Sequence, residues 1–194
     1  VHTMRALRTV LFILVCIGLI WLFVALMMSA FSGGNETEVA APTALTTYAP
    51  TNAEARLSMD GPVVNKEEHD GIRITVSRTQ TQIEIIQGYD NMVVNQRTYA
   101  NTQSSYEKFL ASLDQLGFSS GLSETSSGDE QGKCPMGSRH TYTIEDGNDL
   151  IGHGWSTTCG TGTFGATRSQ IRSLFIRQIP SAEYSELVSG LNVR

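Results

Sequence analysis

Two cysteines and two histidines fall in one short stretch of the chain, at Cys134, His140, His153 and Cys159. Thiolates and imidazoles are the usual protein ligands of zinc, and two nearby thiols outside the cytoplasm normally form a disulfide. Between the two histidines, Asp146-Gly147 is a pair that favours the tight turn of a β-hairpin. A hairpin centred there pairs Cys134 with Cys159 and His140 with His153.

The predicted hairpin separates the zinc interpretation from the disulfide interpretation. Six residues along a strand span about 20 Å, so the cysteine pair and the histidine pair cannot share one metal ion. Directly opposed side chains have Cβ atoms about 4.5–5.5 Å apart, which is near disulfide distance. We therefore expect a Cys134–Cys159 disulfide that stabilises the fold by roughly 3–4 kcal/mol, and neither a metal ion nor a cofactor.

The same hairpin predicts side chains that recognise a ligand. In this register both histidines share the apolar face of the hairpin, and two basic residues follow on the next predicted helix. The candidate recognition surface consists of His140, His153, Trp155, Arg168 and Arg172. Two interpretations of the histidines stay open: core residues with hydrogen-bonded nitrogens, or a paired site that responds to pH or holds a ligand. The arginines form either a solvated helix face or an anion-binding patch.

A second candidate chemistry uses a thiol. The stretch Ser156-Thr157-Thr158-Cys159, followed by Arg168, resembles the end of the sortase family, in which a strand carries a Thr-x-Thr-Cys sequence ahead of an arginine. The resemblance implies an extracytoplasmic transpeptidase with Cys159 as its nucleophile. Sortases have leucine after the first threonine, and their histidine lies much further upstream than His140. A disulfide to Cys134 also consumes the nucleophile, so this enzyme is the alternative interpretation.

Alternating apolar and polar residues predict the strands that position these side chains. The alternation predicts three strands over residues 72–76, 82–87 and 92–98, joined by short breaks as an antiparallel meander. The hairpin around Asp146-Gly147 adds two more strands. These strands predict a sheet with one apolar face.

Helical spacing of apolar residues predicts the remaining elements. A capping box at Ser104–Glu107 predicts a helix that ends near Gly117. Two more helices are expected over residues 167–179 and from Ser181 onward, separated by a proline. The expected fold class is α+β, a small domain of antiparallel strands packed with about three helices.

An apolar segment without a charged residue occupies residues 9–31. At 1.5 Å per residue, a helix of this length covers roughly 30 Å, the thickness of the hydrocarbon core of a bilayer. Arg5 and Arg8 precede the segment, which predicts that residues 1–8 lie in the cytoplasm and that the rest of the chain lies outside. We expect a transmembrane signal anchor in contact with lipid. Its cleavage as a secretory signal is the open alternative.

Composition divides the rest of the chain into two parts. Residues 32–68 are rich in alanine, threonine and proline and predict a flexible linker. Residues 69–194 are expected to form the extracytoplasmic α+β domain. The net charge of -5 argues against a nucleic-acid-binding protein, and the chain carries no phosphate-binding loop. The expected function is therefore a binding or accessory module of the cell envelope, without catalytic activity, with a protein or envelope ligand as its partner.

Overall fold

The computed structural model describes residues 18–21, 43–123, 130, 132–164 and 167–193. The chain divides into two compact units, residues 1–41 and residues 42–194. In the first unit, residues 18–21 are helical. Among the residues that the structure describes, no helix has the length and apolar character needed to cross a bilayer. The predicted anchor, residues 9–31, lies mostly outside these residues and stays a prediction.

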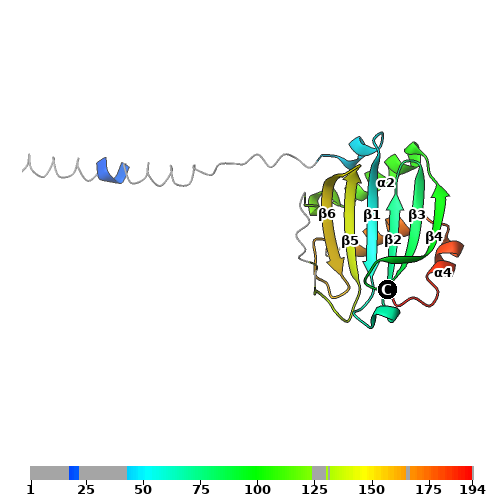
Figure 1. The fold of residues 1–194 in the computed structure, drawn as a ribbon. Helices are drawn as coiled ribbons and strands as arrows, with labels where there is room; N and C mark the ends of the chain where they lie inside the picture. The colour runs from blue at the N-terminus through cyan, green and yellow to red at the C-terminus, as the bar shows by residue number, and fades with distance from the viewer. Residues whose placement is uncertain (1–17, 22–42, 124–129, 131, 165–166, 194) are drawn as a thin grey trace, which may run out of the picture. The chain divides into compact units, whose positions relative to one another are not determined.

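The second unit is built on a six-stranded antiparallel sheet (Figure 1). The strand order is β4-β3-β2-β1-β5-β6, and each strand is antiparallel to its neighbours. The strands are β1 (Ala53–Asp60), β2 (Asp70–Val76), β3 (Gln80–Gln87), β4 (Met92–Ala100), β5 (Arg139–Asp146) and β6 (Asp149–Thr157). The predicted meander corresponds to β2, β3 and β4, and the predicted hairpin to β5 and β6. The α+β class with antiparallel strands is confirmed.

The prediction of a flexible linker over residues 32–68 is wrong for its second half. Residues 53–60 form β1, which lies in the middle of the sheet between β2 and β5. Leu57 is opposite Ile74 on one side and Tyr142 on the other, and Leu57 is fully buried. Every second side chain of β1 is buried, which is the pattern of a strand with one face in the core. The folded unit therefore begins well before residue 69.

Three helices of this unit match the predicted ones: α2 (Gln103–Gln115), α3 (Arg168–Ile176) and α4 (Ser181–Leu187). The cap of α2 is Thr102, whose side chain accepts a hydrogen bond from the Ser105 amide, and so the helix begins earlier than the predicted capping box. Gly117 follows α2 with a φ of 72°, a conformation that glycine adopts without strain.

The core lies between α2, α3 and one face of the sheet (Figure 1). Phe109 of α2 meets Phe175 of α3 edge to face, with ring centroids 5.0 Å apart. Tyr142 of β5 packs against the same group of aromatic rings. The inward residues of the sheet include Leu57, Met59, Ile72, Ile74, Ile83 and Ile144. One face of the sheet is thus covered by helices, and the other face carries polar residues.

Candidate functional site

The β5–β6 hairpin turns one residue later than the sequence predicts. Gly147 and Asn148 are the two central turn residues, because Asp146 pairs with Asp149. Gly147 has a φ of 63°, and glycine in the first central position is typical of a type II′ turn. A register irregularity after Ile144 adds one more residue to β6. Beyond it, Thr143 is opposite His153 and His140 is opposite Ser156.

This register separates the two histidines that were predicted to pair. Side chains alternate along a strand, so His140 and Ser156 face the helices while His153 faces the other side of the sheet. The prediction of a His140–His153 pair is therefore wrong. The candidate recognition surface divides accordingly: His153 and Trp155 lie on the face opposite His140.

His153 has its own surroundings on that face. Its backbone N–H and C=O both bond to Ser123, which lies beside the edge of β6. Its ring Nε2 lies 3.7 Å from the Glu130 carboxylate, and only 6% of the residue is exposed. Trp155 is half-buried, and its amide donates to the Thr163 hydroxyl. Residues from the segment before β5 and from the loop after β6 thus contact His153 and Trp155.

The predicted disulfide is confirmed, although the register that suggested it is wrong. Cys134 and Cys159 are bonded, with Cα atoms 5.7 Å apart. Both lie outside the paired strands, in the loops that lead into β5 and out of β6. Cys134 has a φ of 53°, so its backbone turns away from the extended conformation that ideal pairing requires. Because its sulfur is bonded, Cys159 offers no thiolate for a sortase-like reaction.

Three of the predicted site residues come together between α3 and the hairpin. We call His140, Tyr142, Ser156, Arg168 and Arg172 the α3 cluster. His140, Tyr142 and Ser156 are at most 2% exposed and face α3. Arg168 and Arg172 are one turn apart on α3, both are partly buried, and Arg168 donates a hydrogen bond to the Thr157 carbonyl oxygen. The sequence identified both arginines and His140, but not the two hydroxyls.

Burial lowers the pKa of His140 from 6.5 to about 4, and the positive charges of Arg172 and Arg168 act in the same direction. His140 is therefore neutral at physiological pH. Burial raises the pKa of Tyr142, whereas the Ser156 hydroxyl and the two arginines favour the ionised phenol. Both groups thus keep a polar but uncharged form, and the charge of the cluster comes from its arginines.

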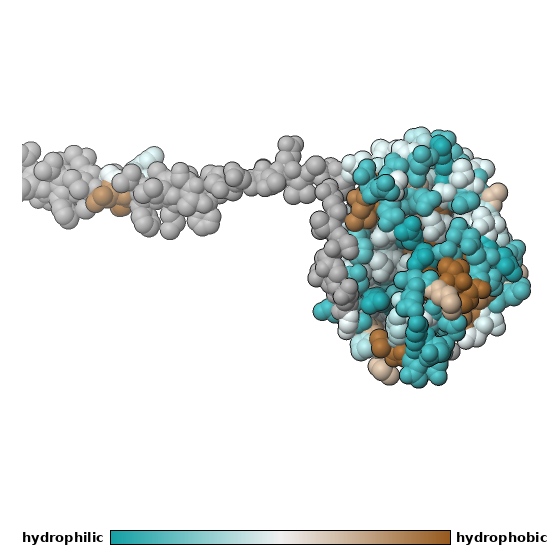
Figure 2. All heavy atoms as spheres, viewed as in Figure 1, coloured by the Kyte–Doolittle hydropathy of each residue, from teal (hydrophilic) through white to brown (hydrophobic). Residues whose placement is uncertain are grey.

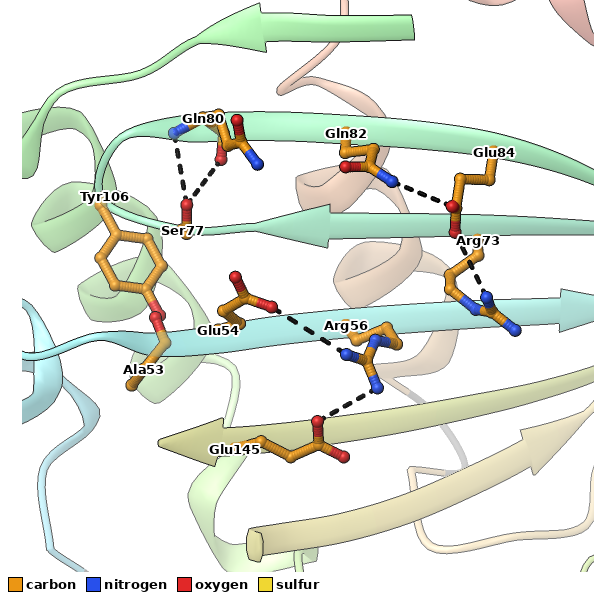
Figure 3. Close-up of polar contacts among 10 residues, drawn as sticks. All are labelled: Ala53, Glu54, Arg56, Arg73, Ser77, Gln80, Gln82, Glu84, Tyr106 and Glu145. Atoms are coloured by element: carbon orange, nitrogen blue, oxygen red, sulfur yellow. Dashed lines mark hydrogen bonds and ion pairs between the residues drawn. The ribbon is translucent and has the colours of Figure 1, made fainter. Parts of the chain in front are cut away.

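The uncovered face of the sheet holds a second feature, a hollow of about 440 Å³. Figure 3 shows most of the side chains that line it. We call it the sheet hollow. It lies over β1, β2 and β3 and is lined only by polar residues: Glu54, Arg56, Arg73, Thr75, Ser77, Gln80, Gln82 and Glu84. Sequence reasoning missed these residues. The alternating pattern predicts the polar positions of β2 and β3, but the composition of residues 32–68 predicts a linker where β1 lies.

Ion pairs across neighbouring strands hold the charged groups of the sheet hollow in place (Figure 3). Arg73 on β2 lies 3.2 Å from Glu84 on β3, and Gln82 donates to the same carboxylate. Arg56 on β1 lies 3.1 Å from Glu145 on β5. Two acids and two bases line the hollow, so the site is polar and close to neutral.

No protein-family model matches this chain, and no curated protein matches it in sequence. The sheet hollow and the α3 cluster therefore rest on their own geometry and chemistry.

Proposed function

We propose that this protein is a non-enzymatic binding module of the cell envelope, carried by a single membrane-spanning segment, and that the sheet hollow is its contact surface. The observation that carries the proposal is the difference between the two faces of the sheet. Helices cover one face, whereas the other presents an open hollow with an entirely polar lining. Figure 2 shows this face as largely hydrophilic.

The charges of the sheet hollow indicate what kind of partner fits. The Arg56 and Arg73 guanidinium groups are matched by nearby carboxylates, and the Thr75 hydroxyl and the Gln82 amide lie among them. Such a surface favours a polar partner of low net charge that offers both hydrogen-bond donors and acceptors, such as a peptide segment or a sugar polymer. A polyanion such as nucleic acid gains little there, because no excess of positive charge attracts it.

Two features support the placement of this module outside the cytoplasm. The apolar segment 9–31 is long enough to span a bilayer, and Arg5 and Arg8 before it favour a cytoplasmic N-terminus. The Cys134–Cys159 disulfide suits an oxidising compartment. The disulfide also weighs against the sortase-like alternative, because it occupies the sulfur of the proposed nucleophile.

Site-specific photocrosslinking in intact cells tests the proposal. A photoreactive amino acid replaces Gln82 in the sheet hollow of the full chain, and a matched version carries it at Lys108, which is exposed on α2 on the opposite side of the sheet. We expect a discrete crosslinked product from position 82 that is absent from position 108. Arg73→Gln removes the ion pair to Glu84 and is expected to reduce the yield at position 82 at least threefold.

The controls separate a lost contact from a lost fold. The thermal midpoint of the Arg73→Gln chain is measured in parallel, since a partly exposed ion pair contributes only about 1 kcal/mol or less to stability. The same products from positions 82 and 108, or no product from position 82, would contradict the sheet hollow as the contact surface. An unchanged yield with Arg73→Gln would do the same.

A further inference from the structure

The α3 cluster contains buried polar atoms that are not hydrogen-bonded within the described part of the chain. They are both ring nitrogens of His140, the hydroxyls of Tyr142 and Ser156, and Nε of Arg172, although the Ser156 hydroxyl is close enough to the Tyr142 phenol to favour its ionised form. Buried polar atoms in native proteins nearly always have partners, because an unpaired one costs about 1–3 kcal/mol. With Ser156 directed at Tyr142, the His140 nitrogens, the Tyr142 proton and Nε of Arg172 still have no partner among the described residues, which points to a bound ligand.

The cluster offers hydrogen-bond donors and an excess of positive charge. The Tyr142 hydroxyl, which the Ser156 hydroxyl approaches, has one proton to donate, and the neutral imidazole of His140 has one N–H. Among the described residues, no carboxylate forms an ion pair with Arg168 or Arg172, and Arg172 donates no hydrogen bond. A partner for this cluster therefore carries negative charge and accepts hydrogen bonds.

The position of the arginines on α3 strengthens the same preference. Arg168 is the first residue of this nine-residue helix, and the side chain of Thr167 before it makes no capping hydrogen bond. The Arg168 amide already donates to the Phe164 carbonyl oxygen, so α3 contributes the charge of its two arginines and the positive end of its dipole. Arg168 is held in place by its hydrogen bond to the Thr157 carbonyl, at the end of β6. Positive charge from α3 therefore acts on the buried polar groups of the hairpin, His140 and Tyr142.

We propose that the α3 cluster binds a tetrahedral oxyanion, a phosphate or sulfate group. The two arginines lie on α3, whereas the Tyr142 hydroxyl and the imidazole lie on the hairpin. Four oxygens in a tetrahedron can accept from both sides, whereas the two oxygens of a carboxylate lie in one plane. The neutral state of His140 lets its ring donate one hydrogen bond without adding a third charge. This site lies on the helix side of the sheet and is independent of the sheet hollow.

Anion titration of the full chain, kept in micelles of an uncharged detergent, tests the proposal. The thermal midpoint is recorded with inorganic phosphate, sulfate or acetate at constant ionic strength, with chloride as the reference. We expect phosphate and sulfate to raise the midpoint and acetate to match chloride. Arg172→Gln is expected to weaken phosphate binding at least tenfold. Arg177→Gln, which alters an exposed arginine just after the same helix, is expected to leave it unchanged.

A second variant keeps the test decisive if Arg172→Gln disturbs folding. Ser156→Ala removes one hydroxyl and is expected to weaken phosphate binding several-fold, and the ¹⁵N resonances of the His140 ring are expected to shift on phosphate addition. If phosphate is an adventitious ion only, it will raise the thermal midpoint equally in the wild type, Arg172→Gln and Ser156→Ala. That result would overturn the proposal. No rise above chloride would also overturn it, and an equal effect of acetate would exclude the tetrahedral assignment.

Discussion

At His140, burial and two neighbouring positive charges act on the pKa in the same direction. The ring lies between Tyr142 and Ser156 on the hairpin and faces Arg168 and Arg172 on α3, and its pKa falls to about 4. Here its neutral form is the one that fits, because a third positive charge in this buried space would be strongly unfavourable.

The lowered pKa of His140 predicts a loss of stability in mild acid. As the pH falls below about 6.5, the unfolded chain binds a proton at this residue, whereas the folded chain binds it only near pH 4. Stability is therefore complete above about pH 6.5 and decreases down to about pH 4, by roughly 2–3 kcal/mol. Urea unfolding at about pH 7 and pH 4.5, in buffers without phosphate or sulfate, measures the loss.

The His140→Gln chain is the reference for this measurement. Glutamine does not titrate, so the difference in unfolding free energy between the two chains isolates His140 from the carboxylates that titrate in both. We expect the variant to lose less stability than the wild type between the two pH values, by roughly 2–3 kcal/mol. Equal losses would show that His140 takes up its proton as readily in the folded chain as in the unfolded one.

Among the elements, β1 has the largest effect on the fold and the weakest local signal. Its inward positions begin with Ala53 and Ala55, which add little apolar character, and Pro50 and Pro62 suggest a loop on either side. Both prolines lie outside the strand, so they limit its length without preventing its formation. The central place of β1 depends on pairing with β2 and β5, which a local pattern does not contain.

Removal of β1 is predicted to abolish folding. A chain that starts at residue 69 lacks the strand that joins β2 to β5, so the sheet separates into one three-stranded part (β2, β3 and β4) and one two-stranded part (β5 and β6). Leu57 and Met59 are both fully buried, and the loss of each side chain would leave a cavity in the core. Each such loss destabilises the fold by about 2–5 kcal/mol. Circular dichroism and urea unfolding should show a cooperative transition for residues 42–194 and none for residues 69–194. A cooperative transition in the shorter chain would show that β1 is dispensable.

The hairpin shows which parts of a site local patterns can predict. Both strands and the disulfide were predicted, because alternation and the cysteine positions are local features. The register was not, since Asp146-Gly147 and Gly147-Asn148 are both reasonable turns. The real turn and the extra residue on β6 shift the pairing by three positions, from His140–His153 to His140–Ser156. An odd shift exchanges the faces of a strand and so changes which residues share a site.

On the scale of the whole molecule, the two candidate sites lie on opposite faces of the sheet. The α3 cluster lies under a helix at the β5–β6 end, and the sheet hollow lies on the other face over β1, β2 and β3. The hollow needed tertiary information, because Arg56 and Arg73 come from strands whose adjacency was not predicted. The α3 cluster was partly predicted, since helical spacing alone puts Arg168 and Arg172 on one side of α3.

The oxidation state of the Cys134–Cys159 pair is predicted to depend on the apolar segment 9–31. If this segment carries the folded unit out of the cytoplasm, the two thiols meet an oxidising environment and form the bond seen in the structure. A chain of residues 32–194 lacks the segment and stays in the reducing cytoplasm. Without the disulfide it is expected to lose about 3–4 kcal/mol of stability, on the chain-entropy estimate for the closed loop.

Thiol labelling with a maleimide-linked polymer measures this difference on a gel. Cys16, inside the apolar segment, is first replaced by alanine so that only Cys134 and Cys159 can be labelled. In cells, the full chain should resist labelling until it is reduced, and residues 32–194 should label directly. Cys134→Ser in the full chain frees Cys159 and should give one label, which shows that the reagent reaches this loop. Direct labelling of both cysteines in the full chain would place the folded unit in a reducing compartment and contradict the anchor orientation. A disulfide in both the full chain and residues 32–194 would show that segment 9–31 does not determine the redox environment of the two cysteines.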